Sequence, residues 1–516
     1  MTLFTECQGP DEETRVRVAH CSMVGGRCPA CKEDLELEQK IRQLQKRRQE
    51  LRTKMNANHD PFILKLPLEV ASHIFLLSMG ARDTSDVSRH GDILPTPFLL
   101  GAVCRGWRQL ARSTPRLWSK LGFSFFDPTD STLTTMEALP LLVADWLERS
   151  GGLPLTLQVS YQGDCETPPE RSVSIINSLN KHSGRWYKVR FALPPNYLER
   201  LCGSSPPNLL REFSISDPDE GTEANTPLTF KMSARPSPTN FSIDGFLLDD
   251  VDIFWDNLVN LNLCRTTLDG VLKVLRAAPL LEMCSLSNIS PPIDDFPIPE
   301  TVIRLQYLHT LEVAWIEEIE VFCEFMDSLE LPSLELWSVE FHGSVLEVDI
   351  MVSFLNRSGC SLETLSIWQK GASAIEDFER LLQAAPYLQH LQVRSPRYDS
   401  SAIPVMDYIL ECLSTSPPHR TMQPDDSAGF LTDLQSLKLD GQQLNAWACI
   451  PLIFRLPHRK RLKLDIRLNT ITISDEISTK LVQLVDQGIE LSIFGPSHRD
   501  YIQTFKDEQQ KDNRSL

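Results

Sequence analysis

The sequence predicts a mixed α/β protein, in which a small helical unit is followed by a long solenoid of strands and helices. A helical leader precedes both. Two observations lead to this prediction. Apolar residues recur at helical spacing across residues 61–123, and a unit of about 26 residues then repeats along most of the remaining chain. The 516 residues are enough for two or more domains with a large core.

The first helix of the helical unit begins at Leu66-Pro67-Leu68-Glu69. Proline is tolerated in a first helical turn, and a glutamate there suits the positive end of the helix dipole. Val70, Ile74 and Leu77 then recur at spacings of four and three, which predicts one apolar helical face.

A second helix is expected after Pro97. It ends at Thr114-Pro115, because the residue before a proline is pushed out of the α region. A short apolar turn with Leu117 and Trp118 follows it. The apolar face of this second helix comprises Leu100, Val103, Cys104, Trp107 and Leu110.

In this order, the two halves resemble an F-box. The first half of the motif runs from Leu66 to Phe75, and the second runs from Leu99 to Trp118. The ending Thr114-Pro115-Arg116-Leu117-Trp118, with leucine-rich sequence behind it, resembles the large F-box-like families of mushroom-forming (basidiomycete) fungi. The segment Ala81–Thr96 departs from the pattern, since a typical F-box has a short turn there. We expect this polar insert to be a surface loop.

The resemblance implies that the helical unit docks on the Skp-type adaptor of a cullin–RING ubiquitin ligase. The alternative is that the apolar stripe is only the core of a helical subdomain. The residues expected to form the F-box core and the adaptor contact are Leu66, Pro67, Ile74, Val103, Trp107 and Trp118.

The solenoid is predicted to span residues 140–503. Its repeats follow an L-x-x-L-x-L pattern that resembles a degenerate leucine-rich repeat, in which stacked strands share one continuous core. The alternative is an ordinary α/β domain with coincidental spacing. The six clearest units are Leu258/Leu261/Leu263, Leu281/Cys284/Leu286, Leu308/Leu311/Val313, Leu334/Trp337/Val339, Leu362/Leu365/Ile367 and Leu388/Leu391/Val393, with weaker ones at Trp186/Val189/Phe191, Leu210/Phe213/Ile215, Leu434/Leu437/Leu439 and Leu462/Leu464.

Two residues between the leucine-type positions are predicted to bind the target. Ser366 and Gln392 should point away from the core, because side chains alternate along a strand. Insertions are expected near 217–240 and 395–429, the second with a short apolar helix. The charged tail, residues 504–516, is predicted to be disordered.

The leader has two parts. Residues 1–33 are expected to be flexible, and the pair Cys28 and Cys31 leaves a zinc site as an alternative that lacks a second pair of ligands. Residues 34–58 are predicted to form a polar helix or a short coiled coil. Its heptad seam contains Leu37, Ile41, Leu44, Arg48, Leu51 and Met55.

Composition and motifs limit the function. The net charge of −18 argues against nucleic acid or an anionic membrane as the main ligand. Thirteen scattered cysteines suit reduced thiols in the cytoplasm or nucleus. No phosphate-binding, zinc-protease or nucleophile-elbow motif is present, so we expect neither an enzyme nor a cofactor.

The resulting hypothesis is a substrate-recognition subunit, with the F-box on the adaptor and the repeats on a protein target. A non-ligase interaction scaffold that uses the same repeats is the alternative. A hydrolase or redox enzyme with an unrecognised site is a third.

Overall fold

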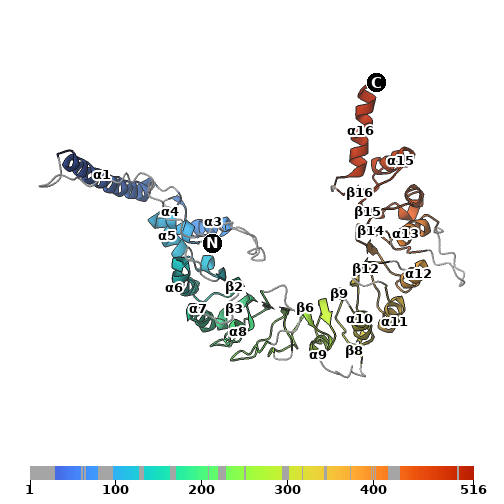
Figure 1. The fold of residues 1–516 in the computed structure, drawn as a ribbon, viewed down its shortest axis with the longest axis horizontal. Coiled ribbons are helices and arrows are strands. Elements are labelled where there is room, and N and C mark those ends of the chain that lie inside the picture. Colours follow the sequence, from blue (N-terminus) through green and yellow to red (C-terminus); the bar gives the residue numbers. More distant parts are fainter. Residues whose placement is uncertain are drawn as a thin grey trace. The chain divides into compact units, whose positions relative to one another are not determined.

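The computed structural model divides into two compact units (Figure 1). The first unit contains residues 1–210 and 232–234, and the second contains residues 211–231 and 235–516. The residues that the structure describes are 29–59, 62, 65–79, 97–126, 133–162, 170–206, 209–218, 228–248, 251–292, 302–316, 318–341, 346–371, 374–396, 398, 400, 402–415, 430–496 and 499–515.

The first unit begins with helices. Helix α1 starts at Pro29, so the last residues of the leader expected to be flexible are helical. The second predicted helix is divided in two, because Cys104 has an extended backbone and its Sγ accepts a hydrogen bond from the Trp107 amide at 3.4 Å. The insert 81–96 and Cys28 lie outside the described residues. The helices are α1 (Pro29–His59), α3 (Leu68–Ser78), α4 (Pro97–Val103), α5 (Arg105–Arg112) and the 3-10 helix η3 (Pro115–Trp118).

The strands of the first unit pair in parallel, β1 with β2 and β2 with β3. The strand β1 begins at Lys120, directly after the helical unit and well before the expected start of the solenoid at 140. The remaining elements of this unit are β1 (Lys120–Phe126), α6 (Leu133–Arg149), β2 (Leu155–Gln162), α7 (Glu170–Lys181), η4 (Ser183–Arg185), β3 (Trp186–Ala192) and α8 (Pro195–Leu198).

The second unit is one parallel strand ladder in which each strand pairs with the next. A separate pair is formed by β8 (Ile303–Arg304) and β10 (Leu329–Glu330). The ladder contains β4 (Glu212–Ser216), β5 (Asn240–Asp244), β6 (Asn260–Thr267), β7 (Met283–Ser290), β9 (Thr310–Ile316), β11 (Leu336–Phe341), β12 (Thr364–Gln369), β13 (His390–Arg394), β14 (Ser436–Gly441), β15 (Lys463–Leu468) and β16 (Leu491–Phe494).

Helices return the chain between these strands. In Figure 1, α10, α11, α12 and α13 follow one another along one side of the ladder, and successive helices pack together. The helices of this unit are α9 (Leu268–Ala277), α10 (Ile319–Asp327), α11 (Val348–Ser358), α12 (Ile375–Gln383), α13 (Ile403–Thr415), α14 (Cys449–Ile453), η5 (Pro457–Arg459), α15 (Asp475–Asp486) and α16 (Tyr501–Ser515).

The leucine-type positions form the core, as the repeat pattern predicts. Leu365 is in register with Leu391, and Ile367 is in register with Val393. All four side chains are at most 1% exposed. Each repeat therefore buries its apolar face against its neighbours, as expected for a stacked solenoid.

Two segments differ from the sequence prediction. The strand β5 follows the expected insertion, and its Phe241 and Ile243 are buried as an additional repeat. The L-x-x-L-x-L pattern does not detect it because no leucine occupies these positions. The tail, expected to be disordered, is helical from Tyr501 to Ser515, and the Tyr501 hydroxyl lies 3.1 Å from Ser478 Oγ.

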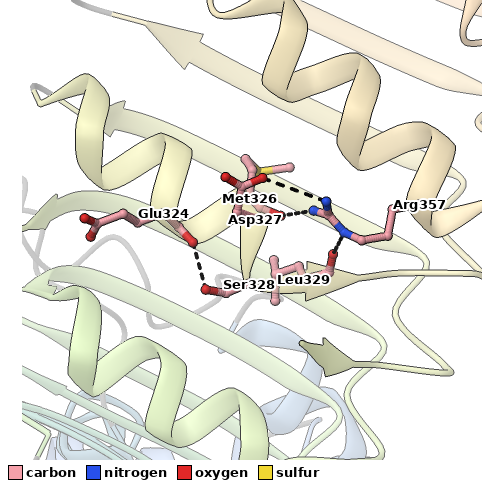
Figure 2. Close-up of polar contacts among 6 residues, drawn as sticks. All are labelled: Glu324, Met326, Asp327, Ser328, Leu329 and Arg357. Atoms are coloured by element: carbon pink, nitrogen blue, oxygen red, sulfur yellow. Dashed lines mark hydrogen bonds and ion pairs between the residues drawn. The ribbon is translucent and has the colours of Figure 1, made fainter. Parts of the chain in front are cut away.

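An arginine in one repeat binds carbonyl groups at the end of the preceding helix (Figure 2). Arg357, near the end of α11, donates to the carbonyl oxygens of Met326 at 2.6 Å and Leu329 at 3.1 Å. Its Nη1 also lies 3.8 Å from Asp327 Oδ1. Met326 lies in the last turn of α10, where carbonyls lack a partner four residues on, and Leu329 lies in β10. Arg357 thus joins its own repeat to the preceding one.

Two other arginines also donate to backbone carbonyls of an earlier segment. Arg459 is fully buried and donates to the carbonyls of Leu431 at 2.5 Å and Phe430 at 2.6 Å. In the first unit, Arg185 donates to the carbonyls of Leu147 at 3.0 Å and Leu153 at 3.3 Å. The repeats are thus joined by charge-assisted hydrogen bonds as well as by their apolar core.

Candidate protein-interaction sites

The helical unit has an aromatic core. Phe75 lies 5.5 Å from Phe62 and 4.9 Å from Trp107, measured between ring centroids. Trp118 is only 1% exposed, and its Nε1 donates to the carbonyl of Ala111 at 2.8 Å. The sequence places Trp118 among the expected adaptor-binding residues, but such burial makes it a core residue that no partner can touch directly.

Helix α6, which lies between β1 and β2 in the chain, packs against this aromatic core. Trp146 lies 5.0 Å from Trp118 and 5.6 Å from Phe98. Arg149 lies over the Trp118 ring at 4.9 Å, and it also pairs with Asp145 at 2.8 Å. This contribution is not predicted from the sequence, because α6 carries no motif of the helical unit.

The helical unit also leaves apolar side chains exposed, and we call these six residues the apolar patch. Three of its α3 members, Val70, Ile74 and Leu77, follow one helical stripe, while Ala71 and Phe75 of the same helix are buried. The apolar patch comprises Leu68, Val70, Ile74, Leu77, Leu99 and Val103. Six exposed apolar side chains on two helices of so small a unit indicate an interaction site.

The residues predicted to bind the adaptor are therefore divided between surface and core. Ile74 and Val103 belong to the apolar patch, and Pro67 is exposed beside it. Leu66 and Trp107 are half-buried, and they pack against the aromatic core. Adaptor binding by any of them stays a prediction.

The strand ladder of the second unit has a polar face. Ser366 and Gln392 are in register on β12 and β13, and both are half-buried beside buried neighbours. They belong to one line of in-register residues, which we call the central row. The central row runs through Ser214, Ser242, Asn262, Ser285, Glu312, Ser338, Ser366, Gln392, Lys438 and Asp465.

Towards the carboxyl end of the ladder, two ion pairs lie on this face. Arg394 Nη2 lies 2.5 Å from Glu340 Oε1, across the intervening strand β12. Arg467 pairs with Asp465 at 3.0 Å and lies 5.6 Å from the Phe494 ring centroid. This part of the face is held by its own ion pairs.

The apolar seam of α1 is exposed. Leu37, Ile41, Leu44, Leu51 and Met55 all face solvent, as a solvated polar helix requires. Whether this seam forms a coiled coil stays a prediction.

The described cysteines are free thiols, and burial raises the pKa of several of them. The pKa of the buried Cys284 is raised to about 12, and burial also raises the pKa values of Cys264 and Cys360. Such thiols stay protonated near neutral pH and are poor nucleophiles.

Among the described side chains, no three His, Cys, Asp or Glu gather as a metal site. No described helix is long and apolar enough to cross a membrane.

Known proteins show little similarity to this chain. No protein-family model matches it, and no curated protein matches it. Among solved structures, the chain is similar to TLR13 in its complex with ssRNA13, at 15% identity and a TM-score of 0.31. The match covers 66% of this chain and 48% of that chain, so it spans about half of that protein's length. A likeness this distant does not define the class of protein, which follows instead from the strands themselves.

By its own strands, the second unit is a leucine-rich-repeat-like solenoid. Parallel strands pair in sequence order, and their leucine-type positions share one core. Extended repeat surfaces of this kind are typical of proteins that bind other macromolecules.

Proposed function

We propose that this protein is the substrate-recognition subunit of a Skp–cullin–F-box ubiquitin ligase. The apolar patch carries the proposal, since it coincides with the stretch that resembles an F-box. Three short helices bury too little surface to stand alone, and a partner that covers the patch removes its apolar side chains from water. The Skp-type adaptor is the partner that the resemblance implies.

The strand face of the second unit would hold the protein target in this proposal. The protein itself performs no bond-making step and is not an enzyme. Its contribution is positional, because a target lysine held near a charged conjugating enzyme reacts in an effectively intramolecular step. Assembly with a cullin ligase would place the protein in the cytoplasm or nucleus.

The proposal is tested by co-purification with a Skp-type adaptor. Leu77→Glu places a charge in the apolar patch at a position that is 68% exposed, so it should abolish adaptor binding without unfolding the protein. The double substitution Leu66→Ala with Pro67→Ala should do the same. Leu141→Glu is the matched control, because Leu141 is 76% exposed on α6, outside the patch. Truncating the central anchors of an interface commonly costs about 2 kcal/mol or more.

A non-ligase interaction scaffold is the second candidate. It uses the same strand face but needs no adaptor. If the wild-type chain fails to co-purify with the adaptor, or if Leu77→Glu binds it as well as Leu141→Glu does, the ligase proposal is wrong and the scaffold remains.

A further inference from the structure

Helix α1 is surrounded by solvent. Every α1 side chain that the structure describes is exposed, and the apolar side chains of Leu44 and Met55 are 69% and 58% exposed. An isolated helix is only marginally stable in water, and most helices in proteins gain their stability by packing one apolar face. The apolar face of α1 is its heptad seam, which we call the α1 seam. It comprises Leu37, Ile41, Leu44, Arg48, Leu51 and Met55.

The spacing of the α1 seam indicates what covers it. Its six positions alternate at intervals of four and three residues, an average of 3.5. Such a repeat keeps its side chains facing a second helix with the same repeat, and the two helices form a left-handed supercoil. A second copy of α1 carries this repeat, so two copies of the chain supply both halves of a coiled coil.

Charge disfavours a parallel pair of α1 helices. In a parallel pair each residue meets its own copy, so Arg48 meets Arg48 inside the seam, where like charges are destabilising. The two ends of α1 also differ in charge, so a parallel pair sets acid beside acid and base beside base. The acidic end carries Glu33, Asp34, Glu36 and Glu38, and the basic remainder carries Lys40, Arg42, Lys46, Arg47, Arg48, Arg52 and Lys54, with Glu50 among them.

An antiparallel pair removes the conflict from the seam. Its six positions are symmetric about residue 46, so every one of them meets a seam position of the second copy. The stem of Arg48 lies along an apolar neighbour while its guanidinium reaches water. The pairs across the seam are Leu37 with Met55, Ile41 with Leu51 and Leu44 with Arg48.

The flanks of the antiparallel pair are unequal. On one flank, Glu38 faces Arg52 of the second copy, which is an attractive pair. The other flank is cationic, since it carries Lys40, Arg47 and Lys54 of both copies. The apolar seam therefore supplies the affinity, and the charges select the orientation.

We propose that this protein forms a homodimer through an antiparallel coiled coil of two α1 helices. The α1 seam is shorter than three heptads, so the dimer dissociates on dilution. Each dimer carries two strand ladders, which raises the apparent affinity for a target with two matching sites. The inference does not depend on the ligase proposal, because the α1 seam and the apolar patch are separate groups of residues.

The first test measures the mass of the full chain by light scattering over a range of concentrations. The wild-type chain should approach twice its monomer mass as the concentration rises. Leu44→Glu places a charge in the middle of the α1 seam and should leave a monomer. Gln43→Glu is the matched control, because it adds the same charge at the adjacent exposed position outside the seam, and it should dimerise like the wild type.

Two milder variants measure the size of the effect. Leu44→Ala removes a central apolar contact and should raise the Kd of the dimer about thirtyfold. Arg48→Leu completes the apolar seam and should lower this Kd. Alanine and leucine both favour a helix, so the change in Kd reports the seam rather than the helix propensity.

Disulfide cross-linking tests the orientation. A chain with Leu37→Cys, mixed with a chain with Met55→Cys, should form a cross-linked pair under mild oxidation. Neither variant alone should cross-link beyond the background that the wild-type cysteines give. A parallel dimer gives the opposite pattern, in which each variant cross-links with itself and the mixed pair does not form.

Three results would overturn the inference: a monomer at every concentration, equal dimerisation of Leu44→Glu and Gln43→Glu, or the parallel cross-linking pattern. If Leu77→Glu abolishes the dimer and Leu44→Glu does not, the apolar patch joins the two copies and the inference is also wrong.

The adaptor assay keeps the two proposals apart. Leu44→Glu should bind the adaptor like the wild type. A monomeric wild-type chain that binds the adaptor contradicts only the inference, and a dimer that binds no adaptor contradicts only the ligase proposal.

Discussion

The helical unit leaves apolar side chains in solvent, whereas the strand ladder buries its apolar side chains between repeats. In the helical unit, α3 buries Ala71 and Phe75 but leaves Val70, Ile74 and Leu77 in solvent. In the ladder, each leucine-type position is covered by the repeats on either side, and polar residues remain outside. The first surface is therefore suited to a partner that supplies apolar contact. The second is suited to a partner recognised by hydrogen bonds and charge.

The difference has a simple origin. The helical unit is made of a few short helices, and it has too few residues to cover every face of α3. A solenoid repeat always has one, except at the ends of the stack. At the carboxyl end, α16 packs against the last repeat through the buried Ile502.

The largest expected effect lies in the ladder and should leave the helical unit untouched. Leu391→Ala removes a buried side chain shared by adjacent repeats, so unfolding of the second unit should lose about 2–5 kcal/mol. Urea denaturation measures this loss. Gln392→Arg, one residue along on the outer face, should leave stability unchanged. A silent Leu391→Ala, or an unfolded Gln392→Arg, would mean that the register of β12 with β13 is wrong.

The adaptor assay tests the same contrast through binding. Because the helical unit belongs to the other compact unit, Leu391→Ala should still bind the adaptor while it loses target binding. Joint loss of both activities would show that the two surfaces are not independent.

A smaller effect is expected where a polar side chain, rather than an apolar one, joins two repeats. Arg459→Ala leaves the carbonyls of Leu431 and Phe430 without their donor, which should cost about 1–3 kcal/mol. Arg455→Ala, at an exposed position nearby, is the control and should be neutral. Thermal unfolding of the two variants compares them directly, and equal stability would show that the arginine bridge contributes nothing.

The smallest effect concerns pH and the first unit. Burial, together with the charges of Arg185 and Lys181, lowers the pKa of His182 below its usual value of 6.5. The unfolded chain therefore binds a proton at His182 more readily than the folded chain does. Above pH 6.5 the imidazole is neutral in both states and the first unit keeps its full stability; as pH falls below 6.5, protonation favours the unfolded state and stability is lost. The melting temperature of the first unit should drop between about pH 7 and mildly acidic pH, and His182→Gln should drop less. An identical pH profile for the two proteins would remove His182 as the cause.

Much of the fold is predictable because its signals are local in sequence. The leucine-type positions of β6, β7, β9 and β11–β13 are periodic, and their burial follows this periodicity. In α3 the apolar stripe Val70, Ile74 and Leu77 predicts the helix but not its buried side, which is formed by Ala71 and Phe75. The strand β5 escapes prediction because Pro238 stands where the other repeats begin with leucine or tryptophan. The helix at the carboxyl end is not predicted either, because its sequence is mostly polar. Its buried residue Ile502 is a single apolar side chain that gives no periodic signal.

The candidate sites are predictable only in part. Ser366 and Gln392 follow from strand alternation, since each lies between buried neighbours. Trp118 belongs to the set expected to form the core and the adaptor contact, and its burial places it in the core. A motif alone does not say which of its members face inward.

The helical unit, the leucine-type positions of the main run of repeats and the acidic character of the chain follow from the amino-acid sequence. Composition and periods of a few residues specify them, and every segment carries these signals locally. Two features emerge only when the chain is folded: α6 packs against the aromatic core, and arginines join successive repeats. These features depend on contacts between residues about 20 or more positions apart, because stacking repeats of that length bring distant segments into register.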